Sequence, residues 1–119
     1  MSELGRPDRF LRLLGLAKRA GRTIAGAPLI FAAMRKKRPP LLVIAAVDAS
    51  PPSAKKLRTQ CEYYRVPLLL SPYTKETLSH AVGQLGPVAA VAVTDEGFAR
   101  ELQKSSGKEV SAPHGNEEK

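Results

Sequence analysis

The segment LLVIAAVDASP, residues 41–51, is the most informative part of this 119-residue chain about its fold. Its seven consecutive apolar residues, Leu41–Val47, lie between two prolines on one side and Asp48, a serine and two further prolines on the other. A helix that crosses a bilayer needs about 20 apolar residues, so this run is too short for a membrane span. A short apolar run between chain breakers is typical of a strand that is buried on both faces. We therefore expect a strand over 41–46 at the centre of a sheet.

Helical and strand-like patterns alternate on both sides of this stretch. The expected helices cover 7–20, about 28 to 38, about 53 to 64, 74–82 and 94–102, and the other expected strands cover 22–25, 66–70 and 88–93. Either Ser50 or Ser53 is expected to cap the third helix. Thr74 and Thr94 are expected to cap the fourth and fifth helices. This alternation predicts an α/β sandwich in which most strands are buried.

The length and composition fit a single domain. A chain of 119 residues with 43% apolar content can form one core and is too short for two comfortable ones. Residues 104–119, KSSGKEVSAPHGNEEK, contain one large apolar side chain, Val110. We therefore expect one domain over 1–103, followed by a disordered tail over 104–119.

Positive charge is concentrated in the first third of the chain. The first 38 residues carry ten Lys or Arg against two acids, Glu3 and Asp8, whereas the remaining residues carry nine bases and nine acids. The whole formal charge of +8 is therefore local. A local excess attracts a polyanion, either a nucleic acid or an anionic membrane surface. Because no apolar segment suits a membrane, we expect a nucleic acid and no membrane.

Other classes of function lack the residues they need. The single cysteine, Cys61, allows neither an intrachain disulfide nor a Cys-rich metal site. The N-terminal segment resembles neither a secretory signal nor a transit peptide, so a cytoplasmic location is expected. No glycine-rich phosphate fingerprint follows a strand, and no catalytic spacing accompanies His80 or His114. We expect no enzyme, no metal and no cofactor.

Two groups of cations are candidate phosphate contacts. The four adjacent cations Arg35–Arg38 are expected to end the second helix, where they either release counterions from RNA or DNA or only relieve the helix dipole. Lys18, Arg19 and Arg22 flank the end of the first helix. The chain then leads to Gly26 and the N-terminus of the second helix, whose free N–H groups suit an anion, although a glycine there is also ordinary turn chemistry.

Two further residues have chemically reactive side chains that also suit a structural role. Asp48 follows the central strand, where open α/β folds place ligands, and it either acts as an acid or fixes the turn. Cys61 has the spacing of a small core residue in the third helix. A small enzyme that uses Asp48 and His80 is therefore one rival hypothesis, for which no substrate suggests itself.

Four segments together resemble a known family. They are LGLAKRAGRTIAG (14–26), LLVIAAVDASP (41–51), CEYYRVPLLL (61–70) and VAAVAVTDEGFA (88–99). In this order they resemble the L7Ae family of ribosomal proteins, and most closely its small bacterial YlxQ-type branch, over about residues 10 to 103. The resemblance implies a three-layer α-β-α sandwich with a mixed, mostly buried four-stranded sheet. It also implies binding to RNA, classically to a kink-turn, where tandem sheared G·A pairs lie beside a sharp bend.

The resemblance also locates an RNA site. In the family a Gly-Thr-Asn-Glu stretch opens the second helix, a Lys follows on that helix, and an apolar loop precedes the last strand. The family's glycine corresponds to Gly26, whereas Ala27, Pro28, Leu29 and Ala32 stand at the positions of its Thr, Asn, Glu and Lys. These four side chains cannot hydrogen-bond to a guanine edge. Cations, the helix N-terminus and the apolar loop remain, and such groups position an RNA more than they read it.

The resulting hypothesis is a protein that binds structured RNA, with ribosomal RNA as the expected partner, and that acts as a ribosome component or an accessory factor. The expected RNA-binding residues are Lys18, Arg19, Arg22, Thr23, Gly26, Ala27, Pro28, Arg35, Lys36, Lys37, Gly86, Pro87, Val88 and Ala89. The alternative is a protein-interaction module that kept the fold and lost specific RNA recognition.

Overall fold

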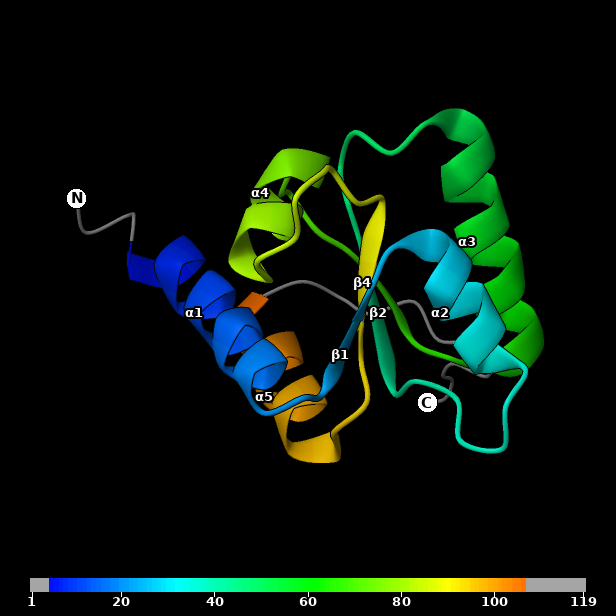
Figure 1. Ribbon diagram of the computed structural model, residues 1–119, viewed down its shortest axis with the longest axis horizontal. Coiled ribbons are helices and arrows are strands. Elements are labelled where there is room, and N and C mark those ends of the chain that lie inside the picture. Colours follow the sequence, from blue (N-terminus) through cyan, green and yellow to red (C-terminus); the bar gives the residue numbers. More distant parts are fainter. Residues whose placement is uncertain (1–4, 107–119) are drawn as a thin grey trace.

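Five helices and four strands alternate along residues 5–106, the part of the chain that the computed structural model describes, with side chains from residue 9 onward (Figure 1). In chain order the elements are α1 Gly5–Arg19, β1 Thr23–Ala25, α2 Ala27–Met34, β2 Leu42–Ala45, α3 Pro51–Tyr64, β3 Leu68–Leu70, α4 Lys75–Ala81, β4 Ala90–Val93 and α5 Glu96–Ser106. The predicted number, type and order of elements are confirmed.

The four strands form one mixed sheet in the order β1-β4-β2-β3. Strand β4 runs antiparallel to β1 and β2, and β2 runs parallel to β3. Val93 of β4 lies opposite both Thr23 of β1 and Leu42 of β2. All four residues of β2 are buried, so the prediction of a central, buried strand is confirmed.

Helices cover both faces of the sheet, as the alternation of side chains along β2 requires. Leu42 and Ile44 belong to a core cluster with residues of α1, α4 and α5. Val43 and Ala45 belong to a second cluster with residues of α2 and α3. Figure 1 shows α1, α4 and α5 on one side of the sheet and α2 and α3 on the other. The predicted three-layer α-β-α sandwich is confirmed.

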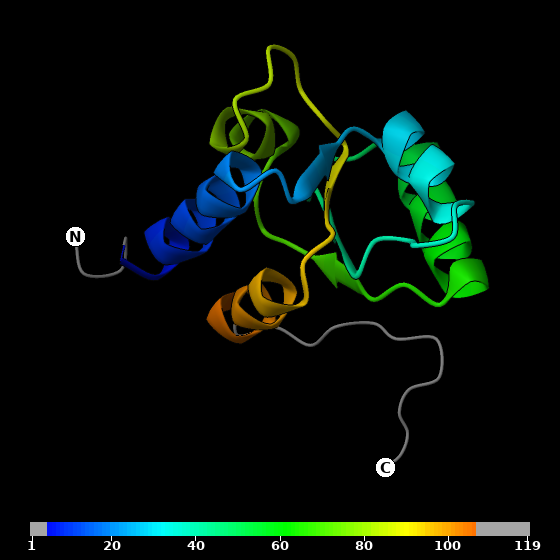
Figure 2. The same ribbon diagram turned by 60° about the horizontal axis from the view of Figure 1, so that its bottom comes forward.

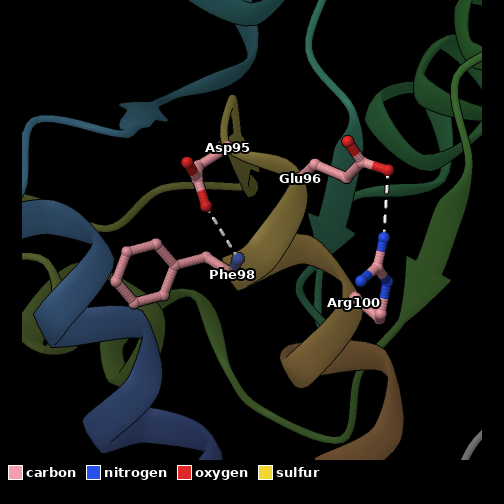
Figure 3. A network of polar contacts seen from close by, with 4 residues as sticks. All are labelled: Asp95, Glu96, Phe98 and Arg100. Atoms are coloured by element: carbon pink, nitrogen blue, oxygen red, sulfur yellow. Dashed lines mark hydrogen bonds and ion pairs between the residues drawn. The ribbon is translucent and has the colours of Figure 1, made fainter.

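Side-chain caps fix where three helices begin. The N–H of Ser53 donates to Oγ of Ser50 at 3.2 Å, so Ser50 is the cap of α3. Thr74 caps α4, as predicted. The prediction that Thr94 caps α5 is wrong, because Oδ2 of Asp95 accepts the N–H of Phe98 at 2.9 Å (Figure 3). Just beyond this cap, Arg100 donates to Glu96 at 3.0 Å (Figure 3).

Other element ends also differ from the prediction. Helix α2 ends at Met34, so the cations of 35–38 follow the helix instead of ending it. The N–H of Arg35 bonds to Ala32 O and that of Lys36 to Ala33 O, which is the tighter bonding of a closing helical turn. Strand β3 lies at an edge of the sheet, and Leu70 at its end is 54% exposed, so it is not fully buried.

Helix α5 continues one turn beyond the predicted end and reaches Ser106. Residues 104–106, which were expected to begin the disordered tail, are therefore helical. The rest of the expected tail, 107–119, lies outside the described residues.

Candidate nucleic-acid interface

Gly26 joins β1 to α2 in a conformation that favours glycine. Its φ is 98° and its ψ is 134°, a region that residues with a Cβ rarely occupy. Its N–H donates to Ala90 O at 3.0 Å, which ties the start of α2 to the start of β4. The backbone conformation therefore favours glycine at this position, where the resemblance also places the family's glycine.

The N-terminus of α2 leaves main-chain donors open. The N–H of Ile30 bonds to Gly26 O at 3.1 Å. Within residues 5–106, the N–H groups of Ala27 and Leu29 have no acceptor, and Pro28 has no N–H. Two free donors and the positive end of the helix dipole suit an anion such as a phosphate.

The loop before β4 lies at the same end of the sheet. Ala89 O accepts the N–H of Ala46 at 2.8 Å, beside the bond between Gly26 and Ala90. Figure 2 shows the loop, in yellow-green, projecting beyond the sheet. Gly86 and Pro87 are exposed, as a binding loop requires, but Val88 is 7% exposed and belongs to the core. Val88 therefore supports the loop from inside.

Two exposed leucines at this end were not among the predicted site residues. Leu85 is 96% exposed in the loop, and Leu29 is 63% exposed in the first turn of α2. The sequence does contain a signal for the exposure of Leu85, which lies between Gly83 and Gly86. A large apolar residue between two chain breakers has little core to join. We call Gly26–Leu29 together with loop 84–89 the Gly26 end.

Arg22 and the cations of 35–38 lie at the opposite end of the sheet. Arg22 O accepts the N–H of Thr94, and the N–H of Leu41 donates to Val93 O, both at 2.9 Å. Arg22 and the start of β2 therefore flank the last residues of β4, whereas Gly26 lies beside its first residue. Four residue steps along β1 separate Arg22 from Gly26, roughly 13 Å at the rise of a strand. The structure thus divides the predicted site in two.

Two predicted site residues, Lys18 and Thr23, contact other parts of the protein itself. Nζ of Lys18 donates to Val82 O at 3.0 Å, which joins the last turn of α1 to the C-terminal end of α4. A cation there also complements the helix dipole. Thr23 lies in β1 opposite Val93 and is half-buried. Arg19 is exposed at the end of α1.

The acidic and nucleophilic candidates have structural roles. Oδ1 of Asp48 accepts the N–H of Lys75 at 2.8 Å and so fixes the turn after β2 to the start of α4. His80 lies in the last turn of that helix, so Asp48 and His80 are at its opposite ends. Burial raises the pKa of the Cys61 thiol to about 12. The predicted core position of Cys61 is confirmed.

The described part of the chain contains neither a metal-binding cluster nor a membrane-spanning helix. Among residues 9–106, no group of three His, Cys, Asp or Glu side chains is arranged to hold a metal ion. No helix within the described range is both long enough and apolar enough to span a membrane.

Comparison with known proteins agrees with this architecture. The fold defines a class of small α-β-α sandwiches with a mixed four-stranded sheet, in which a glycine opens α2 beside a projecting loop. Residues 8–103 match the model of the ribosomal protein L7Ae/L30e/S12e/Gadd45 family. The chain belongs to this family, and the resemblance noted from the sequence is confirmed.

Its relatives include two proteins named RNA-binding protein YlxQ. The one from Bacillus subtilis (strain 168) is 39% identical over 90 residues, which cover 76% of this chain and 87% of the relative. The one from Enterococcus faecium is 29% identical over 100 residues, which cover 84% and 93%.

Solved structures include a Bacillus halodurans protein of unknown function, which is 31% identical and has a TM-score of 0.74. The match covers 83% of this chain and 97% of that one. The Giardia lamblia 15.5kD RNA binding protein is 20% identical with a TM-score of 0.69, over 87% and 86% of the two chains, and shares the fold.

Proposed function

We propose that this protein binds structured RNA of the kink-turn type at the Gly26 end. The observation that carries the proposal is the pairing of Gly26, in its positive-φ conformation, with a projecting loop at the N-terminus of α2. Two open N–H groups face outward from this N-terminus, and two exposed leucines lie at the same end. The names of the YlxQ relatives support RNA as the ligand.

The chemistry of the Gly26 end favours positioning of RNA over reading of its bases. Main-chain N–H groups donate to phosphates, and exposed leucines pack against an unstacked base. Pro28, Leu29 and Ala32 carry no side-chain donor or acceptor toward a guanine edge. For an RNA long enough to reach them, the exposed cations Arg19, Arg22 and Arg35–Arg38 then supply most of the affinity through counterion release.

A kink-turn RNA and a matched duplex test this proposal. The duplex has the same length, with the tandem sheared G·A pairs replaced by Watson–Crick pairs. Fluorescence anisotropy at equal salt should show tighter binding to the kink-turn by roughly tenfold, which is about 1.4 kcal/mol. Equal affinity for the two RNAs would refute recognition of the kink-turn.

We further propose that the cellular ligand is ribosomal RNA, with the protein acting in the cytoplasm as a ribosome component or an accessory factor. Sedimentation of a cell extract through a sucrose gradient should place the protein with ribosomal subunits or their precursors. Sedimentation only with free protein, at low and at physiological salt, would contradict this assignment.

The rival function is a protein-interaction module, which the exposed Leu29 and Leu85 also suit. Replacing Arg19, Arg22 and Lys36 by Glu separates the two functions. Binding of an RNA long enough to reach these residues should collapse in this variant because all three side chains are exposed cations. A partner that docks on the leucines should bind this variant as well as it binds wild type. A variant that still performs the wild-type function in cells would therefore favour the rival.

A further inference from the structure

The end of the sheet opposite the Gly26 end gathers six exposed cations from three chain segments. One precedes β1, four connect α2 to β2, and one follows α3. Figure 1 shows that β1 and β2 begin, and α2 and α3 finish, toward this end of the molecule. We call this surface the cationic end, and it comprises Arg22, Arg35, Lys36, Lys37, Arg38 and Arg65.

These six side chains have no partner among the side chains and backbone that the structure describes. Among residues 9–106, none of them makes a hydrogen bond or an ion pair. Two arginines elsewhere do, since Arg9 pairs with Glu101 and Arg100 with Glu96. One acid, Glu62, stands in the last turn of α3 before Arg65. The cationic end therefore keeps its charge available for an external polyanion.

Arg65 stands where the backbone favours glycine. Its φ of 59° and ψ of 45° are left-handed, and among residues 5–106 it is the one non-glycine residue with positive φ. Glycine is the usual residue at such a helix end because it lacks a Cβ. A strained backbone occupied by a charged side chain is the pattern of a functional position.

An exposed aromatic residue stands two positions before Arg65 in the sequence. Tyr63, in the last turn of α3, is 76% exposed, and its ring meets that of Tyr64 edge to face at 4.8 Å between centroids. Cations next to an exposed aromatic ring suit nucleic acid, because phosphates pair with the cations and a base stacks on the ring. An acidic polypeptide would pair with the cations but has no bases to stack on the ring.

We propose that the cationic end binds the backbone of a second RNA segment, an arm that extends beyond the motif held at the Gly26 end. This inference rests on the proposed function. Strand β1 places Arg22 roughly 13 Å from Gly26, so the cationic end meets RNA that continues past the groups held at the Gly26 end. The protein then contacts RNA at both ends of its sheet, and the cations add affinity only when the arm is present.

Three RNAs and two matched variants test the proposal. The RNAs are the minimal motif, the motif with a duplex arm, and the arm alone. The test variant carries Arg35→Gln, Lys36→Gln and Lys37→Gln. The control variant loses three exposed cations of the α1 and α5 layer, by Arg12→Gln, Arg100→Gln and Lys104→Gln.

The expected result is a loss confined to RNAs with the arm. For the motif with the arm, the test variant should lower the slope of log affinity against log salt by about 2 to 3, because each lost phosphate contact removes about 0.9. The control variant should keep the wild-type slope, and the test variant should keep wild-type affinity for the minimal motif. Equal slopes for the two variants, or equal losses on the minimal motif, would overturn the proposal.

Arg65→Gly is a second variant, chosen because glycine suits the left-handed backbone at this position. Its melting temperature should be unchanged or higher, because glycine relieves the left-handed backbone. Its salt slope on the RNA with the arm should fall by about 1. An unchanged slope would contradict the role of Arg65, and displacement of the RNA by poly-glutamate as readily as by unlabelled RNA would contradict RNA as the ligand.

The two proposals fail in different ways. If wild type binds kink-turn and matched duplex equally, the proposed function fails, whatever the variants show. If wild type prefers the kink-turn but the test variant behaves as the control variant on every RNA, the cationic end fails alone.

Discussion

Gly26 is the residue on which the candidate site depends most. Its φ of 98° is strained for any residue with a Cβ, although no atom lies within 4 Å of the position of an added Cβ. Gly26→Ala should therefore lower the free energy of unfolding by about 1–3 kcal/mol through backbone strain alone. Urea denaturation measures this, with Gly86→Ala in the exposed loop as a control that should change by less than about 0.5 kcal/mol. Equal effects at the two glycines would contradict the strain at Gly26.

The residues after Gly26 are the basis of the proposal that base reading is weak, and the family pattern can be restored there. Pro28→Asn, Leu29→Glu and Ala32→Lys together return three of the four side chains that the family pattern has at these positions. The preference for a kink-turn over a matched duplex should rise at least tenfold, since one bidentate base contact contributes about 1–3 kcal/mol. Replacing Ala32→Lys by Ala33→Lys in the same variant keeps the charge and should lose part of the gain. No change in preference would mean that RNA does not lie against α2.

Cys61 shows how the core controls reactivity. Its thiol is 2% exposed, and burial raises its pKa to about 12, so it is protonated at neutral and mildly alkaline pH. The thiolate is the reactive form. A disulfide reagent at pH 8 should therefore leave the folded protein unmodified and label one thiol per chain in urea. Rapid labelling of the folded protein would contradict the packing of α3 against β2.

At the scale of elements, α3 depends on its cap. Oγ of Ser50 accepts the N–H of Ser53, whereas Oγ of Ser53 makes no bond among the described residues. Ser50→Ala should cost about 1 kcal/mol of stability, and Ser53→Ala should change it by less than half as much. Thermal unfolding monitored by circular dichroism measures both. The reverse order would show that the helix begins at Ser53.

The elements could be predicted from the sequence because each carries a local signal. The apolar run of β2 lies between prolines, and the helices show apolar spacing of three and four residues. Element ends were harder to predict. Asp95 and Thr94 are both good caps, and only the bond from Phe98 decides between them. Likewise, the exposure of Leu70 depends on β3 being an edge strand, which no local pattern reveals.

At the scale of the whole molecule, the sequence identified the cations but not their separation from Gly26. Arg22 and Gly26 are four residues apart, which suggests a single site. In the structure, the intervening strand is fully extended and carries them to opposite ends of the sheet. Lys18 was likewise indistinguishable from its neighbours until α4 placed Val82 O within 3.0 Å of its ammonium. Such relations arise from pairing of distant segments, so periodicity and spacing cannot show them.

The net charge of the protein is the basis of the proposal that phosphate contacts dominate binding. The measurement that tests it most directly is the affinity of the full chain for a kink-turn RNA with a duplex arm, titrated from about 50 to 300 mM salt. Because the six cations of the cationic end have no partner within residues 9–106, the slope of log affinity against log salt should be about −4 or steeper. A slope between zero and about −1 would contradict the account, because it would mean that at most one phosphate is neutralised.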